Sequence, residues 1–470
     1  MSDGIWAPDR RLLTVGLVGL ITAAAFEGMA VPTVLPALAG ELDGLDLYGW
    51  AFSAFWLTNI IGITLAGSDT DRRGPGRAFI VGSVLFTLGM VVSGLAGDMG
   101  IVIVGRAIQG FGSGAISAVV WAVIALAYPP SATPRMIALI SSAWIVPGLI
   151  GPALAGLVTD TAGWRWVFLG VALPVLLTAV ALFSRLASMG PARTTEPARS
   201  DARRAIDSLR LAVGSAFILS ATTIEFTVPA AGLLLVGAWL AVGALRHLVP
   251  AGTLVAARGR PAVVATIFVI GFAFFGTEAF VPLTVVEVRG GTVTLGGLAL
   301  SAAAVTWGTG SWLQARAAAA GIRRALVTGG AVLIAVGIGI TSAILLPEVP
   351  VFVAAIGWAI GGLGMGLAYS MLTLLVLETA TPGEEGFSSS ALALMFTLGT
   401  AFGAGIGGSV VAAADRGVIN LAAAVAIVNG AMILAALGAV AISLRVPRRG
   451  VSAGTRAVHA QAAGLPLEHP

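Results

Sequence analysis

The sequence contains no cysteine, no lysine and few charged residues of any kind. Of its 470 residues, 10% are charged and 57% are hydrophobic, whereas soluble proteins have about 25% charged residues. The absence of cysteine excludes disulfide bonds, thiol catalysis and cysteine-based metal sites. Arginine supplies all of the basic charge, but it is distributed along the chain rather than gathered in one basic domain. We therefore expect no nucleic-acid partner despite the formal net charge of +4.

Catalytic signatures are also missing from the sequence. The three histidines are His247, His459 and His469, and none belongs to a His-Glu-x-x-His zinc motif. The chain has no Gly-x-Ser-x-Gly elbow and no nucleotide-binding Gly-x-x-x-x-Gly-Lys sequence. An enzyme or a membrane sensor is accordingly only a remote alternative, and we expect neither a metal nor an organic cofactor.

Long hydrophobic runs are abundant, and many exceed the roughly 18 residues that indicate a membrane-spanning helix. Charges and turn residues separate these runs into fourteen segments, so the sequence predicts an all-α polytopic membrane protein. The predicted spans are 12–38, 48–66, 78–96, 101–127, 136–159, 164–184, 208–226, 229–247, 261–287, 293–314, 324–346, 350–377, 387–414 and 417–444.

The arginines predict the orientation of these helices. With the N-terminus inside, only Arg165, Arg289 and Arg416 lie on the outer side, and Arg106 lies within a helix. The first hydrophobic run exceeds the length of a signal peptide, so we interpret it as an uncleaved helix. We expect a multi-pass protein of a bacterial cell membrane, with both termini in the cytoplasm.

The two ends of the chain share an internal repeat. Residues 105–114 (GRAIQGFGSG) and 357–366 (GWAIGGLGMG) are identical at six of ten positions, at an offset of 252. The Val-Pro pairs of 30–34 and 280–284 match at nearly the same offset. Related parallel halves are typical of transporters that bind their substrate between the halves. The repeat divides the chain into a six-helix half (1–186), a linker with two inserted helices (187–260), a second six-helix half (261–445) and a tail (446–470).

Three motifs resemble those of the major facilitator superfamily. The loop GSDTDRRGPGR (67–77) is similar to the superfamily's inner-loop motif, with a Pro75–Gly76 pair replacing part of its basic run. GRAIQGFGSG resembles the helix 4 motif, and PGLIGPALAG (147–156) resembles the helix 5 antiporter motif. The matching residues are Gly67, Asp71, Arg72, Gly74 and Arg77 in the loop, Arg106, Gln109 and Gly110 in helix 4, and Gly148, Gly151, Pro152 and Gly156 in helix 5.

With fourteen helices, the chain resembles most the 14-helix drug:proton antiporters of that superfamily. That family has an Asp nine residues before a proline in helix 1, and here Glu27 stands nine residues before Pro36. The resemblance implies that the loop motif forms an inner gate, in which Asp71 approaches the start of a helix of the other half, and that Pro152 takes part in exchange transport.

Two acids and one arginine lie deep inside predicted spans, away from their ends, where a charge costs roughly 2.5–3.5 kcal/mol. At about 1.5 Å per residue, Glu27, Glu278 and Arg106 all fall in the outer half of the membrane. Low polarity favours the protonated form of a carboxyl group. We therefore predict that Glu27 and Glu278 carry protons and that Arg106 modulates their affinity. A structural hydrogen-bonding role remains the alternative for each.

Prolines follow both acids. Pro32 cannot donate to the carbonyl of Gly28, and Pro282 cannot donate to that of Glu278, so each acid is predicted to lie at a kink. Deep tryptophans either line a cavity for lipophilic cations or pack in the core. They are Trp56, Trp121, Trp144, Trp307 and Trp358, and Gln109 is a further candidate for the cavity wall.

These observations predict a proton-coupled secondary transporter that exports amphipathic or drug-like small molecules by alternating access. A lipid or metabolite exporter on the same scaffold is the alternative. The proton is the expected coupling ion, and membrane lipid is an expected contact. Because one chain contains both halves, we expect a monomer.

Overall fold

The computed structural model describes residues 4–191, 198–224, 227–317, 321–381 and 384–447. Fourteen of its helices are long and apolar enough to cross a membrane. This confirms the predicted fold class and the predicted number of spans. Most of the predicted tail, 446–470, lies outside the described residues.

Most spans are single helices with bounds within a few residues of those predicted, but α2 ends seven residues later and α8 begins ten residues earlier than predicted. The helices are α1 (Arg11–Glu41), α2 (Tyr48–Arg73), α3 (Pro75–Gly94), α4 (Met99–Ala127), α5 (Thr133–Ser142), α6 (Ile145–Ala162), α7 (Arg165–Ala187), α8 (Ala198–Thr223), α9 (Val228–Leu248), α10 (Arg260–Glu278), α11 (Val281–Leu283), α12 (Val293–Ala317), α13 (Arg323–Ser342), α14 (Val353–Glu378), α15 (Glu385–Asp415) and α16 (Leu421–Ser443). Short turns of helix precede or follow them at η1 (Leu45–Leu47), η2 (Thr253–Val255), η3 (Thr284–Val288) and η5 (Ala343–Leu345).

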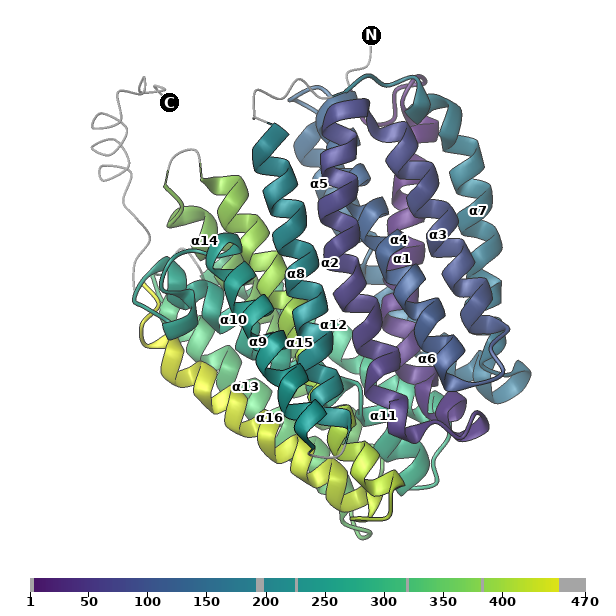
Figure 1. Cartoon of the computed structure of the whole chain (residues 1–470), viewed down its shortest axis with the longest axis vertical. Helices are drawn as coiled ribbons and strands as arrows, with labels where there is room; N and C mark the ends of the chain where they lie inside the picture. Colours follow the sequence, from purple (N-terminus) through teal and green to yellow (C-terminus); the bar gives the residue numbers. More distant parts are fainter. Residues whose placement is uncertain (1–3, 192–197, 225–226, 318–320, 382–383, 448–470) are drawn as a thin grey trace.

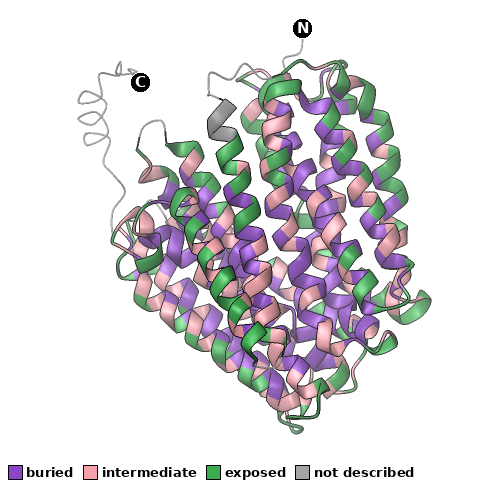
Figure 2. Ribbon diagram, viewed as in Figure 1, coloured by how far each residue is buried: buried purple, intermediate pink, exposed green. Residues whose placement is uncertain are grey.

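The helices form two groups, which we call the N-terminal half (α1–α7) and the C-terminal half (α10–α16) (Figure 1). The two halves meet through α1 and α6 against α12, and through α2 against α15. Between the halves in sequence, α8 and α9 form an antiparallel pair that we call the inserted hairpin. Buried residues concentrate where helices face one another, and exposed residues lie on their outward faces (Figure 2).

The repeat seen in the sequence produces the same packing in both halves. In α4, a side chain at Gly110 or Gly114 would collide with backbone atoms of α2. In α14, Gly362 and Gly366 approach the backbone of α12 in the same way. Glycine at these positions allows the helix backbones to touch, as small residues do in membrane helix pairs. The equivalent pairs α2–α4 and α12–α14 therefore anchor the inner layer of each half.

The fifth span differs from the prediction of one helix over 136–159. It is broken into α5 and α6 at Ala143 and Trp144. The cause is Pro147, which has no N–H to donate to the carbonyl of Ala143. The helix α6 continues without interruption through Pro152.

The ninth span, predicted over 261–287, is also interrupted. The helix α10 ends at Glu278, and the chain continues through α11 and the wider turn of η3. This agrees with the kink expected from Pro282. In contrast, α1 remains one helix through both Pro32 and Pro36.

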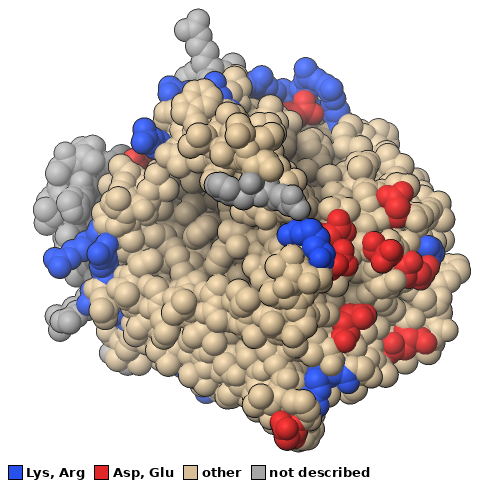
Figure 3. Space-filling model, turned by 60° about the horizontal axis from the view of Figure 1, so that its bottom comes forward, with Lys and Arg blue, Asp and Glu red and all other residues tan. Residues whose placement is uncertain are grey.

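The two ends of the molecule carry different charges. Turns at the end away from the N-terminus contain acids such as Asp43, Asp160 and Asp415. Figure 3 shows acidic side chains gathered on one part of the surface at this end. The opposite end contains the chain's N-terminus and the loops richest in arginine. We call these the acidic end and the basic end.

Candidate functional site

A buried ion pair joins α1 to α4 inside the N-terminal half. The side chains of Glu27 and Arg106 are 1% and 2% exposed, and Arg106 Nη1 donates to Glu27 Oε1. The same nitrogen donates to Gln109 Oε1 at 2.7 Å. Arg106 Nε donates to the carbonyl of Ala51 at 3.1 Å, and its guanidinium lies 4.3 Å from the ring centre of Phe55. The arginine is thus fixed on four sides, and its charge is directed at Glu27.

This cluster leaves two buried polar atoms without a hydrogen-bond partner among the described protein groups. They are Glu27 Oε2 and Gln109 Nε2. An unsatisfied buried polar atom costs about 1–3 kcal/mol, so the cluster is not optimised for stability alone. The free oxygen of Glu27 is available to a proton.

The second acid, Glu278, is the last residue of α10 in the C-terminal half. It is partly buried and forms no ion pair with any described residue. Its carboxyl group lies near the indole of Trp358. Trp358 is fully buried, and its Nε1 makes no hydrogen bond to a described protein group. The two acids therefore differ, because only Glu27 has a cationic partner.

The first turn of α2 connects the two acidic sites. Tyr48 donates its hydroxyl to the carbonyl of Ala279, next to Glu278, at 2.8 Å. The carbonyl of Ala51, three residues further along α2, accepts from Arg106. Three residues advance a helix by about 4.5 Å. Glu27, Arg106 and Glu278 thus lie near one level of the membrane, toward the acidic end.

Six aromatic side chains of the C-terminal half form a continuous cluster beside Glu278. Phe274 stacks on Trp358 with ring centres 4.5 Å apart and meets Trp307 edge-on at 5.7 Å. Tyr369 connects Trp307, at 5.7 Å, to Phe396, at 4.9 Å. The full cluster consists of Phe274, Phe275, Trp307, Trp358, Tyr369 and Phe396. Sequence reasoning identified its tryptophans but missed the phenylalanines and Tyr369, which had no signal beyond being aromatic.

The remaining predicted wall residues lie outside this aromatic cluster. Trp56 packs edge-on against Phe55, 5.3 Å away, in the N-terminal half. Trp121 and Trp144 are 51% and 43% exposed, so they are not part of the buried aromatic cluster. Gln109 is fully buried and accepts from Arg106, so it is a partner of the ion pair, and its role as a cavity wall stays a prediction.

The helix 5 motif lies where the two halves meet. A side chain at Gly156 would collide with backbone of Thr294 in α12, and the carbonyl of Pro152 contacts Gly297 of the same helix. Gly148 faces Ala304 and Met29, and Gly151 faces Phe26. The glycines of the motif therefore allow α6 to pack closely on α12 and α1.

One residue that sequence reasoning missed, Asp160, joins the halves directly. Its carboxylate accepts from the backbone N–H of Val293 at 3.2 Å and of Thr294 at 2.9 Å, and from the Thr294 hydroxyl at 2.6 Å. An acid of the N-terminal half thus caps the start of α12 in the C-terminal half, where the helix dipole favours negative charge. Its position four residues after Gly156, next to a turn, was the available signal.

The predicted inner-gate motif lies at the basic end, in the turn between α2 and α3. Gly74 adopts φ +87°, which favours glycine, and ends α2. Arg77 lies 3.9 Å from Asp69, and Gly67 has open space around it. Asp71 and Arg72 each have an interaction. The role of these residues as a gate stays a prediction.

Acids near the basic end pair within their own half. Glu378 accepts from Arg323 at 2.9 Å, and Glu384 accepts from Arg260 at 2.8 Å. Hydrogen bonds from Thr381 and Arg260 hold the pKa of Glu384 below its ordinary value. Both acids are thus bound to arginines of the C-terminal half, Arg323 and Arg260.

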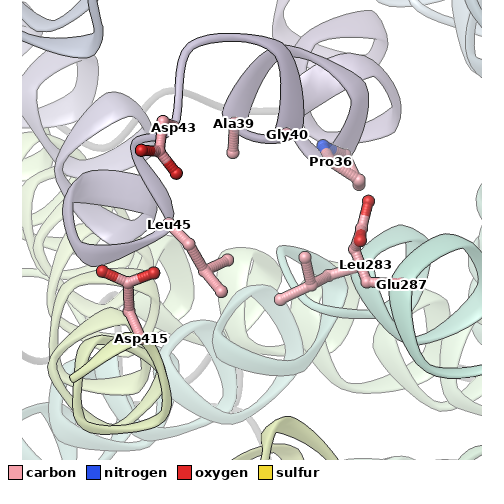
Figure 4. Close-up of a pocket in the computed structure, with 8 residues that line it drawn as sticks. All are labelled: Pro36, Ala39, Gly40, Asp43, Leu45, Leu283, Glu287 and Asp415. Atoms are coloured by element: carbon pink, nitrogen blue, oxygen red, sulfur yellow. The ribbon is translucent and has the colours of Figure 1, made fainter. Parts of the chain in front are cut away.

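A cavity of about 170 Å³ lies between the halves at the acidic end. Asp43 and Asp415 stand on one side of it and Glu287 on the other (Figure 4). Leu45 and Leu283 extend between them. The three acids are exposed, so the cavity forms an acidic mouth at this end of the boundary between the halves.

The sequence profile of the Major Facilitator Superfamily matches residues 16–404. A probable multidrug-efflux transporter of Mycobacterium tuberculosis is 27% identical over 443 residues, covering 91% of this chain and 93% of its own length. A multidrug transporter protein of Bacillus subtilis is 24% identical, covering 84% of this chain and 74% of its own length.

Solved structures share the fold at lower sequence identity. A POT family transporter in complex with 5-aminolevulinic acid superimposes with a TM-score of 0.67 at 15% identity, covering 93% of this chain and 96% of that one. A bacterial homologue of the human lysosomal transporter Spinster gives a TM-score of 0.65 at 15% identity, with the same coverage. At this identity the likeness concerns the fold alone.

Proposed function

Because the chain belongs to the major facilitator superfamily and is a membrane transporter rather than an enzyme, we propose that it exports amphipathic, drug-like molecules in exchange for protons. The relatives named as multidrug-efflux transporters support the substrate class. The coupling mechanism rests on the side chains described above.

The buried Glu27–Arg106 pair is the observation that carries the proposal. A charged group in the membrane interior is costly, so such residues are rarely present without a task. Here an arginine fixed by Ala51, Phe55 and Gln109 holds a carboxylate that still has one free oxygen. Protonation of Glu27 would release Arg106 from its ion pair, and deprotonation would restore it. A bound proton is thereby linked to the packing of α1 against α4.

The aromatic cluster of the C-terminal half supports contact with a lipophilic cation. Aromatic faces attract cations by about 0.5–2 kcal/mol or more when desolvated, and Glu278 adds a carboxylate without a cationic partner. Substrate and proton would then occupy different halves, at nearly the same level of the membrane. Binding of one can oppose binding of the other through the first turn of α2.

Alternating access requires that the contacts between halves break and reform. At the acidic end they are close: the backbones of Gly49 and Gly408 touch, and Ser53 donates to the carbonyl of Ala401 at 2.7 Å. In Figure 1 the two halves lean apart toward the basic end. We propose that this conformation receives substrate from the basic end, which faces the cytoplasm of a bacterial cell, and that the working unit is a monomer.

The test is transport of a fluorescent lipophilic cation into proteoliposomes with an acidic interior. The variants are Glu27→Gln, Glu278→Gln and, as a matched control, Glu348→Gln, whose carboxylate is exposed in a loop at the acidic end. We expect gradient-driven uptake in the wild type and the control. Glu27→Gln should abolish the dependence on the gradient, and Glu278→Gln should weaken binding of the cation at least tenfold.

Wild-type uptake that does not depend on the pH gradient would contradict proton exchange. In that case neutral metabolites and lipids would be tested on the same vesicles. Equal activity of Glu27→Gln and Glu348→Gln would remove Glu27 from the coupling mechanism.

A further inference from the structure

The inserted hairpin occupies a defined position between the two halves. Its first helix, α8, packs against both α2 and α15, and α9 packs on α8 (Figure 1). Trp239 and Leu235 of α9 are 75% and 72% exposed, as expected for side chains that face lipid. Thus α8 is the only element of the hairpin with extensive described contacts to both halves.

Contacts between α8 and the N-terminal half are found at both ends of α8. Toward the basic end, Thr64 of α2 donates to Ser208 at 3.0 Å. Toward the acidic end, Trp50 of α2 donates its indole N–H to Thr223 at 3.3 Å. These two hydrogen bonds are separated by fifteen residues of α8, about four helical turns, and hold α8 along α2.

Contacts between α8 and the C-terminal half lie at the acidic end. The hydroxyl groups of Thr222 and Ser409 are 2.8 Å apart, and Arg416 donates to the carbonyl of Thr223 at 3.3 Å. Leu219 packs so closely on α15 that a side-chain carbon at Gly405 would lie 2.7 Å from it. Ser53 of α2 reaches the same glycine, so α2, α8 and α15 meet at one point.

We propose that the inserted hairpin is a clasp of the gate at the acidic end. It is fixed on α2 and moves with the N-terminal half. The last turns of α8 contact α15 through Leu219, Thr222 and Thr223 when the acidic end is closed, and these contacts break when that end opens. This inference rests on alternating access in the proposed function and assigns a task to two helices that the six-plus-six repeat does not need.

The cysteine-free chain allows a direct test with two matched pairs of introduced cysteines. The pair Thr222→Cys with Ser409→Cys joins α8 to α15, and the pair Thr64→Cys with Ser208→Cys joins α8 to α2. Both replace hydroxyl groups that lie about 3 Å apart. Each disulfide is formed in proteoliposomes, verified by mass spectrometry and then reduced.

We expect the disulfide to α15 to lower transport at least tenfold, with recovery on reduction, and the disulfide to α2 to leave it within twofold. Transport that persists with the disulfide to α15 would overturn the proposal. So would a disulfide to α2 that blocks transport, because the hairpin would then move relative to the N-terminal half.

A second measurement does not depend on transport. Spin labels at Leu95→Cys and Val418→Cys, which are exposed on the two halves at the acidic end, report its opening. We expect Thr222→Val to increase the long-distance population severalfold and Thr64→Val to leave it unchanged. Equal distributions in the two variants would overturn the clasp. Lack of gradient-driven uptake in the uncrosslinked protein would instead count against the proposed function.

Discussion

At the scale of single residues, the molecule treats its two membrane acids differently. Glu27 forms an ion pair with Arg106, whereas Glu278 lies beside aromatic rings and has no cationic partner among the described residues. A buried ion pair contributes little net stability, but removal of one partner leaves an uncompensated charge. A single substitution in the ion pair should therefore cost more stability than the double substitution.

For the ion pair, we expect Arg106→Gln alone to destabilise the protein by about 3–5 kcal/mol, because Glu27 would keep a buried charge without a partner. The double variant Glu27→Gln, Arg106→Gln should recover most of this loss, because neither residue is then charged. Thermal unfolding in detergent measures both.

The double variant should nevertheless lack proton-driven transport. Equal melting temperatures of Arg106→Gln and the double variant would contradict this prediction, because Glu27 would then carry no uncompensated charge in Arg106→Gln. Glu278→Gln, which removes no ion pair, provides the comparison and should unfold close to the wild type.

At the scale of helices, the boundary between the halves depends on how helix ends and glycine faces meet. Asp160 caps α12 from the opposite half, while Asp98 caps α4 from within its own half, accepting from the N–H of Ile101 at 2.9 Å. Both residues cap a helix N-terminus, but only Asp160 does so across the boundary between the halves. The two therefore form a matched pair for testing the equilibrium between the closed and open acidic end.

Replacement of an N-cap acid by alanine costs about 1 kcal/mol. For Asp160→Ala we expect that cost to fall on the closed acidic end only, which shifts the equilibrium toward opening by about fivefold. For Asp98→Ala the cost falls on both states equally. Spin-label distances at Leu95 and Val418 should change in the first variant and not in the second.

The contact between Gly49 and Gly408 predicts a steric effect at the same end. A methyl group at Gly49 would lie 2.7 Å from backbone atoms of Ala404 and Gly408, which cannot rotate away. Gly49→Ala should therefore open the acidic end and reduce transport severalfold. Gly339→Ala in α13, where a methyl group meets nothing within 4 Å, should be neutral. Closed distances in Gly49→Ala would contradict this packing.

At the scale of the whole molecule, charge and chain direction predict the orientation in the membrane. The arginine-rich end should face the cytoplasm, because basic loops are retained on that side. Single cysteines at Gly163 (acidic end) and Gly190 (basic end) can be introduced without background labelling, since the chain has no cysteine. In intact cells an impermeant maleimide should label the first site and not the second. The reverse pattern would invert the proposed direction of transport.

The sequence by itself determined the number of spans, because hydrophobic length is a local property that the membrane requires of each helix. It also determined the repeat and the break at Glu278, since Pro282 removes a hydrogen bond wherever the helix packs. The residues Glu27, Glu278 and Arg106 could be selected from the sequence because charge is rare at such depth.

Only the tertiary structure decided which of these residues meet. The Glu27–Arg106 contact joins residues 79 positions apart, and no local pattern fixes the rotation of α1 against α4. The same holds for Asp160 on α12, for the aromatic cluster drawn from four helices, and for α8 between α2 and α15. Helical period and hydrophobicity specify which face is apolar. In a chain that is apolar on nearly every face, the choice of neighbour depends on where glycines allow close approach and where buried polar groups find partners.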